Sequence, residues 1–228
     1  MGRESVSVYF AGALFNHKDL LGNAVLADKI REVSGGRYRC ALPQNLQGGD
    51  CGAKRVRDAD ILELLSCDAA LFGFDGSELD SGTVVEFMFA KFADIPSVVL
   101  RTDFRGGGDC ENAGGCEGAF PWNLMAAFYP RTETVLADAG QMYRRHLGGS
   151  EAPGGDADGI AAAFRAAEEL AETVVGALEK VVGAPPEMPA RLRPGVYEWL
   201  GRMPGFSDAS ASGKILAALE RKIAKKIL

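Results

Sequence analysis

Short apolar runs followed by helical segments recur along the first half of the chain, and this alternation constrains the fold more than any other feature. Each run has the length of a buried strand, and the segment after it has apolar residues at helical spacing. The predicted strands are Val6–Phe10, Tyr38–Leu42, Ala69–Phe74 and Ser97–Leu100, with a fifth possible at Thr134–Leu136. Such alternation forms parallel βαβ units. The sequence therefore predicts a flavodoxin-like α/β fold, a doubly wound parallel five-stranded sheet with helices on both faces.

The helices between these strands have recognisable boundaries. Asn16 can cap a helix over His17–Val33, and a second helix covers about Lys54–Ser66. The helix after the third strand is predicted over Glu86–Phe92, and a short helix that runs through Tyr143 follows the fifth strand. The glycine-rich segment from Arg101 to Phe120 reads as a surface loop.

The pattern changes at about residue 150, which predicts two parts. Residues 1–150 form the α/β domain, the glycine-rich break from Gly148 to Gly159 follows it, and residues 151–228 form a helical C-terminal extension. The extension contains an amphipathic helix over Ile160–Val182 and ends in a basic amphipathic helix over Gly213–Leu228. That last helix could contact a membrane or partner. We expect instead that the extension packs on the domain or a neighbouring subunit, with the basic face in solvent.

Composition and motifs exclude several classes of function. The net charge of −6 argues against a nucleic-acid partner, because such proteins usually present a basic surface. The cysteines form no CxxC pair, and the chain has no HExxH, P-loop or GxGxxG motif. No apolar run reaches the ~20 residues that span a bilayer. We therefore expect a cytoplasmic protein with small-molecule substrates, with no metal or cofactor, and with no nucleic acid or membrane as partner.

The candidate site lies at one edge of the predicted sheet. Right-handed crossovers place the loops after parallel strands on the same edge, where open α/β sheets bind ligands. The polar residues expected at that edge are Tyr9, Gln44, Gln47, Asp75, Asp80 and Glu86. The stretch from Asp75 to Glu86, between the third strand and its helix, is the centre of this group.

Carboxylates are the remaining candidates for chemistry. Paired acids at a sheet edge suit cleavage of glycosidic bonds, where one attacks the sugar carbon and the other moves a proton at the leaving group. Glu86 is the better nucleophile candidate, because a helix and an apolar collar hold it. Any single acid could equally be a helix cap or a solvated charge: Asp75 and Asp80 stand where a cap could be, and Asp58 is expected to be solvated.

Several segments in the same order resemble the nucleoside 2-deoxyribosyltransferase family. They are Val8-Tyr9-Phe10-Ala11-Gly12-Ala13-Leu14-Phe15, Asp60, Asp68-Ala69-Ala70-Leu71-Phe72-Gly73, Asp80 with Glu86 six positions on, and Asn123-Leu124-Met125. The resemblance covers roughly residues 5–145 and points to a protozoan-type member. The loop from Arg101 to Phe120 and the chain after residue 150 fall outside it.

The resemblance implies a role for each matched residue. Glu86 would be the nucleophile that forms a covalent deoxyribosyl ester, Tyr9 would orient it, and Asp60 would protonate the departing base. Asp80 and Asn123 would hold the sugar hydroxyls, with Asn123 and Met125 supplied by a neighbouring subunit. Either Gln44 or Gln47 would read the base. The implied protein is a homo-oligomeric salvage enzyme with shared active sites, which exchanges purine or pyrimidine bases between deoxynucleosides.

Two other functions remain open from the sequence. The first is hydrolysis of a deoxynucleoside or its 5′-monophosphate, because Ser77, Ser81 and Thr83 offer hydroxyls for a phosphate while Asp80 would repel one. The second, less favoured, is a non-catalytic binding module. Base preference, the balance between transfer and hydrolysis, the oligomeric state and the role of the tail after Gly183 are left undetermined.

Overall fold

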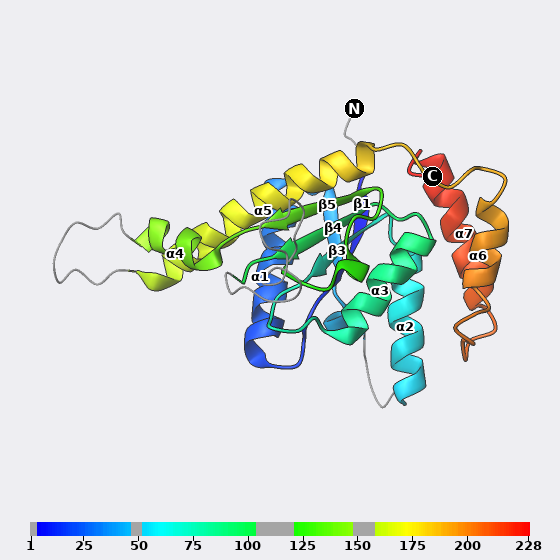
Figure 1. Cartoon of the computed structure of the whole chain (residues 1–228), viewed down its shortest axis with the longest axis horizontal. Helices are drawn as coiled ribbons and strands as arrows, with labels where there is room; N and C mark the ends of the chain where they lie inside the picture. The colour runs from blue at the N-terminus through cyan, green and yellow to red at the C-terminus, as the bar shows by residue number, and fades with distance from the viewer. Residues whose placement is uncertain (1–3, 47–51, 104–120, 148–157) are drawn as a thin grey trace.

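A five-stranded parallel sheet organises the computed structural model, which describes residues 4–46, 52–103, 121–147 and 158–228 (Figure 1). Its strands are β1 (Val6–Ala11), β2 (Tyr38–Ala41), β3 (Ala69–Gly73), β4 (Ser97–Arg101) and β5 (Thr132–Leu136). Their order is β2-β1-β3-β4-β5, and every neighbouring pair is parallel. This is the flavodoxin-like order, with its topological switch between β1 and β3. The predicted fold class is confirmed.

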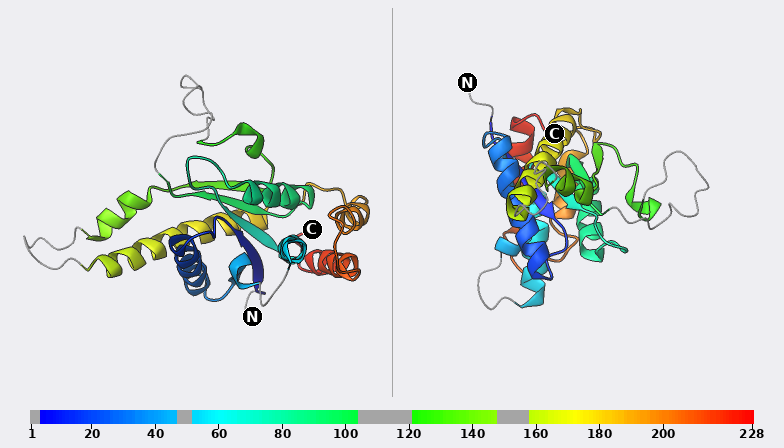
Figure 2. Two further views of the ribbon diagram at one scale, coloured as in Figure 1. Left: turned by 90° about the horizontal axis from the view of Figure 1, so that it is seen from below. Right: turned by 90° about the vertical axis from the view of Figure 1, so that its left-hand side faces the viewer.

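Helices cover both faces of the sheet (Figure 2). Helices α1 (His17–Val33) and α5 (Gly159–Gly183) pack on one face, and α2 (Ala53–Ser66) and α3 (Ser81–Phe92) pack on the other. Helix α4 (Ala139–Leu147) lies along α5, and the short 3-10 helices η1 (Pro43–Asn45) and η3 (Leu124–Ala126) occupy connections. Each layer therefore has its own apolar core against the sheet.

Most element boundaries agree with the sequence analysis. Helix α1 has the predicted range, and the Asn16 side chain accepts bonds from the Lys18 and Asp19 amides. Helix α3 begins earlier than predicted, because Asp80 caps it by accepting a 2.8 Å bond from the Thr83 amide. Residues 104–120 of the predicted glycine-rich loop, and residues 148–157 of the predicted break, lie outside the described residues.

The chain after Gly183 adds two helices beside α2 and α3 (Figure 1). Helix α7 (Ala211–Ala224) was expected, whereas α6 (Arg193–Leu200) was not. A proline near the start of α6 does not prevent the helix, because the first turn leaves its amides unpaired in any case. The Tyr197 hydroxyl donates to the Ala93 carbonyl at 3.0 Å, and Lys222 Nζ donates to the Leu65 carbonyl at 2.5 Å. These bonds tie the tail to the ends of α3 and α2.

Asp58 contradicts its prediction as a solvated charge. It is buried on α2 and accepts a 2.7 Å bond from the amide of Ser207, which lies between α6 and α7. The covering segment is distant in the sequence, so the local pattern around Asp58 could not reveal this burial.

In the part of the chain that the structure describes, no helix is both long and apolar enough to cross a bilayer.

Candidate active site

The centre of the candidate site is a hydrogen bond between Tyr9 and Glu86. Side chains alternate along β1, so Tyr9 faces the α2–α3 layer while Val8 and Phe10 face the other core. The buried Tyr9 hydroxyl donates to Glu86 Oε1 at 2.7 Å. Beside Glu86, the ring of Phe87 makes an edge contact with Phe72 at 5.3 Å between centroids. This packing fixes the position of α3 over the sheet and holds Glu86 at Tyr9.

Burial gives this pair unusual proton affinities. It raises the pKa of Glu86 to about 7; the bond from Tyr9 acts in the opposite direction, and the charges of Asp60 and Asp80 add to the rise. Burial, and then the charge of Glu86, raises the pKa of Tyr9 far above its ordinary value. Tyr9 therefore remains a hydrogen-bond donor at any physiological pH, and Glu86 changes charge near neutrality.

Asp60 brings a second carboxyl group to the same place. It lies on α2, and burial raises its pKa to about 6. Its Oδ1 atom is buried and accepts no hydrogen bond from any residue that the structure describes. The charge of Asp60 contributes to the raised pKa values of both Glu86 and Tyr9. The two carboxyls therefore lie close enough for the charge of Asp60 to raise the pKa of Glu86.

Asp80 is close enough for its charge to raise the pKa of Glu86, but its carboxylate also caps α3. Oδ2 accepts 2.8 Å bonds from both the amide and the hydroxyl of Thr83. The neighbouring Asp75 accepts bonds from the Thr102 and Asp103 amides and the Thr102 hydroxyl, at 2.6–2.8 Å. It joins the loops after β3 and β4, which is a structural role.

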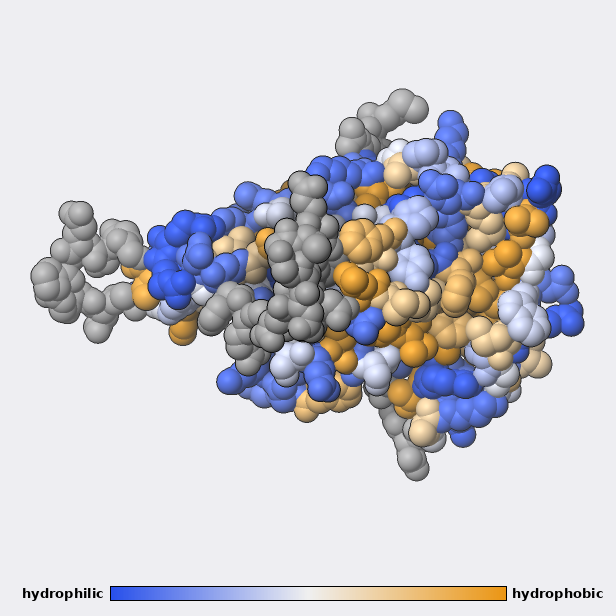
Figure 3. All heavy atoms as spheres, viewed as in Figure 1, coloured by the Kyte–Doolittle hydropathy of each residue, from blue (hydrophilic) through white to orange (hydrophobic). Residues whose placement is uncertain are grey.

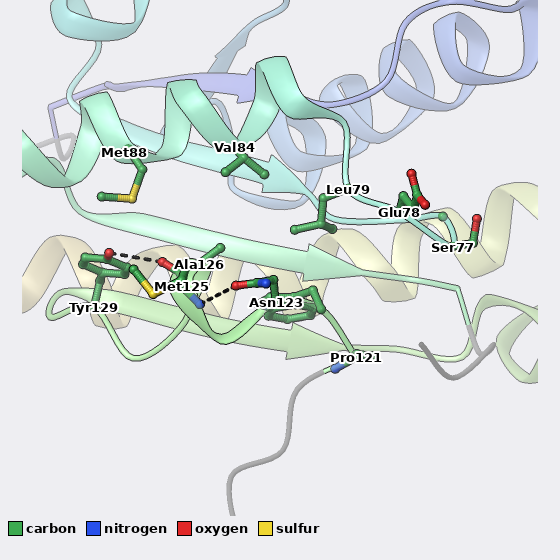
Figure 4. Close-up of a pocket in the computed structure, with 12 residues that line it drawn as sticks. Ser77, Glu78, Leu79, Val84, Met88, Pro121, Asn123, Met125, Ala126 and Tyr129 are labelled. Atoms are coloured by element: carbon green, nitrogen blue, oxygen red, sulfur yellow. Dashed lines mark hydrogen bonds between the residues drawn. The ribbon is translucent and has the colours of Figure 1, made fainter. Parts of the chain in front are cut away.

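Asn123 and Met125 lie on the other side of α3 from Glu86. Both line a cavity of about 500 Å³, into which α3 contributes Val84 and Met88 (Figure 4). Those residues are two positions before and after Glu86, about 200° around the helix. Asn123 caps η3 by accepting a 2.9 Å bond from the Met125 amide. In a single chain, neither Asn123 nor Met125 belongs to the group formed by Glu86, Tyr9 and Asp60.

Of the two glutamines predicted to read the base, the structure describes Gln44 only. Gln44 lies in η1, where its amide nitrogen donates to the Leu20 carbonyl at 3.0 Å. Its Oε1 atom is buried and accepts no hydrogen bond within the described ranges. This leaves Gln44 with an acceptor that a bound donor could use. Gln47 lies outside the described residues.

A second cavity opens at the same sheet edge on the α1–α5 face. It measures about 920 Å³, and Gly12, Gly73 and Asp80 form part of its lining. Gly12 comes directly after β1, and Gly73 is the last residue of β3. The two backbones lie side by side there, and a Cβ atom on Gly12 would be 3.8 Å from Gly73 Cα. The topological switch point is therefore open above the sheet, as in other folds of this class.

Arg101 is a residue of this edge that the sequence analysis missed. It is buried, and its guanidinium donates to the carbonyls of Phe74 at 2.7 Å and Gly76 at 3.1 Å. These bonds shape the start of the loop that leads to Asp80. A charged residue directly after the apolar strand Ser97–Leu100 was the available signal. Within the described parts of the chain, no cluster of three or more His, Cys, Asp or Glu side chains is placed to hold a metal ion.

Comparison with known proteins gives weak structural likenesses. No protein-family model and no curated protein matches the chain. A conserved protein from Enterococcus faecalis V583 is similar in structure, with a TM-score of 0.49 and 27% identity, over 60% of this chain and 94% of that protein. A 2-desoxiribosyltransferase from Leishmania mexicana is similar with a TM-score of 0.43 and 23% identity, over 56% of this chain and 89% of that protein.

Proposed function

We propose that this protein is a nucleoside 2-deoxyribosyltransferase, which exchanges the purine or pyrimidine base of a 2′-deoxynucleoside by double displacement at Glu86. The observation that carries the proposal is the 2.7 Å bond from buried Tyr9 to Glu86, whose pKa is affected by the charge of the half-buried Asp60. A desolvated carboxylate with a fixed rotamer and a second carboxyl of raised pKa is the equipment that glycosidic exchange requires.

In the first half of the reaction, the sugar moves from the base to the enzyme. Tyr9 holds Oε1 of Glu86, so Oε2 attacks C1′ of the deoxyribose. The C1′–N bond breaks, and protonated Asp60 delivers its proton to the departing base nitrogen. Proton transfer of this kind contributes typically ~10²–10⁴-fold to the rate. The products of this step are a free base, ionised Asp60 and a deoxyribosyl ester of Glu86.

In the second half, a different base takes the place of the first. Its ring nitrogen attacks C1′, the ester bond breaks, and the proton of that nitrogen passes to the Asp60 carboxylate. Glu86 is then an anion again, and Asp60 is ready for another cycle. Two inversions at C1′ retain the configuration of the sugar, as in retaining glycosidases.

The sugar anchors would come from both sides of a subunit boundary. Asp80 is close to Glu86 in the same chain, whereas Asn123 and Met125 face a cavity on the far side of α3. If Asn123 and Met125 serve the sugar, they must do so at the Glu86 of a second copy. Met125 would then help to exclude water while the ester waits for its acceptor.

The main alternative is hydrolysis, in which water accepts the sugar. The substrate would be either a deoxynucleoside or its 5′-monophosphate, and only the second requires a phosphate-binding site. Thr83 was one of the hydroxyls available for a 5′-phosphate, but it is buried and donates to Asp80. Ser77 lines the cavity on the far side of α3. These placements favour nucleosides over nucleoside monophosphates as substrates.

Incubation with a deoxynucleoside and a different free base tests the proposal. The expected main product is the exchanged deoxynucleoside, with free deoxyribose as a minor product. Deoxyribose as the main product at every acceptor concentration would identify a hydrolase. Parallel incubations with purine and pyrimidine acceptors would give the base preference.

A further inference from the structure

The tail after Gly183 packs against α2, the helix that carries Asp60. Figure 2 shows α2 between the sheet and α7. Ile215 and Leu219 of α7 belong to the same buried apolar cluster as Leu65 of α2. Apolar side chains also gather along the boundary between α3 and α6, on the face that Figure 3 displays. The tail therefore forms a packed layer outside the two helices of the candidate site.

The first half of α2 is mostly exposed, and Asp58 links it to the tail. Among the described residues from Ala53 to Asp58, only the last is buried. Gly52, at the N-cap, has no side chain that could cap the helix. Asp58 Oδ2 accepts a 2.7 Å bond from the amide of Ser207, between α6 and α7. The tail backbone therefore holds this half of α2 through one buried carboxylate.

Asp58 and Asp60 project from different sides of α2. They are two positions apart, which is about 200° around a helix. Asp58 faces the tail, whereas Asp60 faces the candidate site, where its charge raises the pKa of Glu86. Oδ1 of Asp60 is buried and accepts no hydrogen bond from any residue that the structure describes. Since no such bond fixes Oδ1, the position of this carboxyl depends on where α2 lies.

We propose that Asp58 and Ser207 are positioning residues for the acid Asp60, an assignment that rests on the function proposed above. The Ser207 amide holds Asp58, Asp58 holds the first half of α2, and the placement of α2 sets how close the Asp60 carboxyl comes to the departing base. Neither positioning residue needs to contact the substrate. The chain after Gly183, which lies outside the family resemblance, thereby has a part in the reaction.

Asp58→Ala tests the assignment, because it removes the acceptor of the Ser207 amide. The kcat of base exchange should fall roughly 10–100-fold for ordinary bases with little change in KM, since a misplacement of about 1 Å can cost about 100-fold. A base that leaves without protonation should lose much less. Asp58→Asn keeps an oxygen that can accept the same bond, so it should restore most of the rate.

Tyr197→Phe is the matched control for a loosened tail. It removes the 3.0 Å bond from the tail to the Ala93 carbonyl at the end of α3, and it leaves the Asp58–Ser207 bond in place. Its rate of exchange should equal that of the wild type. A loss as large as that of Asp58→Ala, or an equal loss for both kinds of base in Asp58→Ala, would overturn the proposal.

Carbon-13 NMR of the aspartate carboxyls gives a readout that needs no activity, with Asp60→Asn to assign the signal. Burial raises the pKa of Asp60 from 3.8 to about 6. In Asp58→Ala, water should reach the carboxyl and this pKa should fall toward its ordinary value. Ser207→Pro removes the donor from an exposed segment instead, and it should give the same fall even where Asp58→Ala does not fold. An unchanged pKa of Asp60 in either folded variant would overturn the proposal.

The positioning and the chemistry can fail separately. A fall in the pKa of Asp60 in these variants, with no base exchange by the wild type, would contradict the function proposed for Glu86 and support the positioning of Asp60 by the tail. Base exchange by the wild type, with an unchanged pKa of Asp60 in both variants, would do the reverse.

Discussion

Replacement of Tyr9 by phenylalanine tests how the site sets the charge of Glu86. The substitution removes only the hydroxyl that donates to Oε1 at 2.7 Å, and it keeps the ring that fills the core beside α2 and α3. Because this bond lowers the pKa of Glu86 against the effect of burial, its loss should raise that pKa above the present value of about 7.

The magnitude follows from the kind of bond. A hydrogen bond to a charged group contributes about 1.5–3 kcal/mol. One pH unit corresponds to 1.36 kcal/mol, so the pKa of Glu86 should rise by roughly 1–2 units in the Tyr9→Phe variant. At pH 7 the ionised fraction would fall from about one half to roughly 1–10%. The rate of base exchange at pH 7 should fall roughly 5–50-fold from this cause alone.

Two measurements together check this prediction. Carbon-13 NMR of the glutamate carboxyls gives the pKa of Glu86 directly, with Glu86→Gln to assign its signal. The pH dependence of kcat/KM gives the same ionisation as the acid limb of the profile, which should move upward by the same amount. Tyr9 itself does not titrate in this range, because burial keeps its pKa far above the ordinary value. An unchanged or lowered pKa of Glu86 in Tyr9→Phe would refute the reasoning, whatever happened to the rate.

Three further substitutions follow from the same structure. Glu86→Gln should abolish exchange yet stabilise the fold. The pKa of Glu86 is about 7 in the folded protein and 4.5 in its ordinary state, so ionisation of Glu86 lowers the stability of the wild type as pH rises through 7. Denaturant unfolding should therefore show that the variant gains up to about 3 kcal/mol at pH 8 and nothing at pH 4. Equal stability at both pH values would contradict the raised pKa. Asp60→Asn should lower kcat for ordinary bases by ~10²–10⁴-fold and much less for a base that leaves without protonation; equal losses for both would remove Asp60 as the acid. Lys222→Met should leave exchange unchanged and stabilise the fold by about 1–4 kcal/mol at pH 7, because burial lowers the pKa of this fully enclosed amine to about 7. The gain should be smaller near pH 10, and thermal unfolding at the two pH values measures it. A loss of stability would show that the hydrogen bond from Lys222 to the Leu65 carbonyl outweighs the cost of the buried charge.

The sequence predicts the α/β layers well because their signals are local. The short apolar run over Val6–Phe10 and the helical spacing along His17–Val33 are patterns of neighbouring residues, and their boundaries agree closely with the structure. The proximity of Tyr9 and Glu86 also follows, because parallel strands bring their loops to one edge. The residues themselves favoured Glu86 as the nucleophile, whereas the roles of the other site residues came from the family resemblance; all of these roles are proposals.

The features that the sequence analysis missed depend on contacts between distant segments. Asp58 is buried because Ser207 reaches it from the tail, and no local pattern encodes that contact. Lys222 is partly an exception. It follows Ile215 and Leu219 at helical spacing, so it falls on the apolar face of α7 rather than on the basic one. The position of Lys222 in the helix, rather than its charge, therefore predicts that it lies in the core.

The most direct test of the central claim is to trap the covalent intermediate. The protein is incubated with a deoxynucleoside and no acceptor base, quenched with acid, digested and analysed by mass spectrometry, with Glu86→Gln as the control. The account predicts a deoxyribosyl group on the peptide that contains Glu86, which disappears when a free base is added before the quench. An unmodified Glu86 peptide during active base exchange, or a sugar attached to another residue, would contradict it.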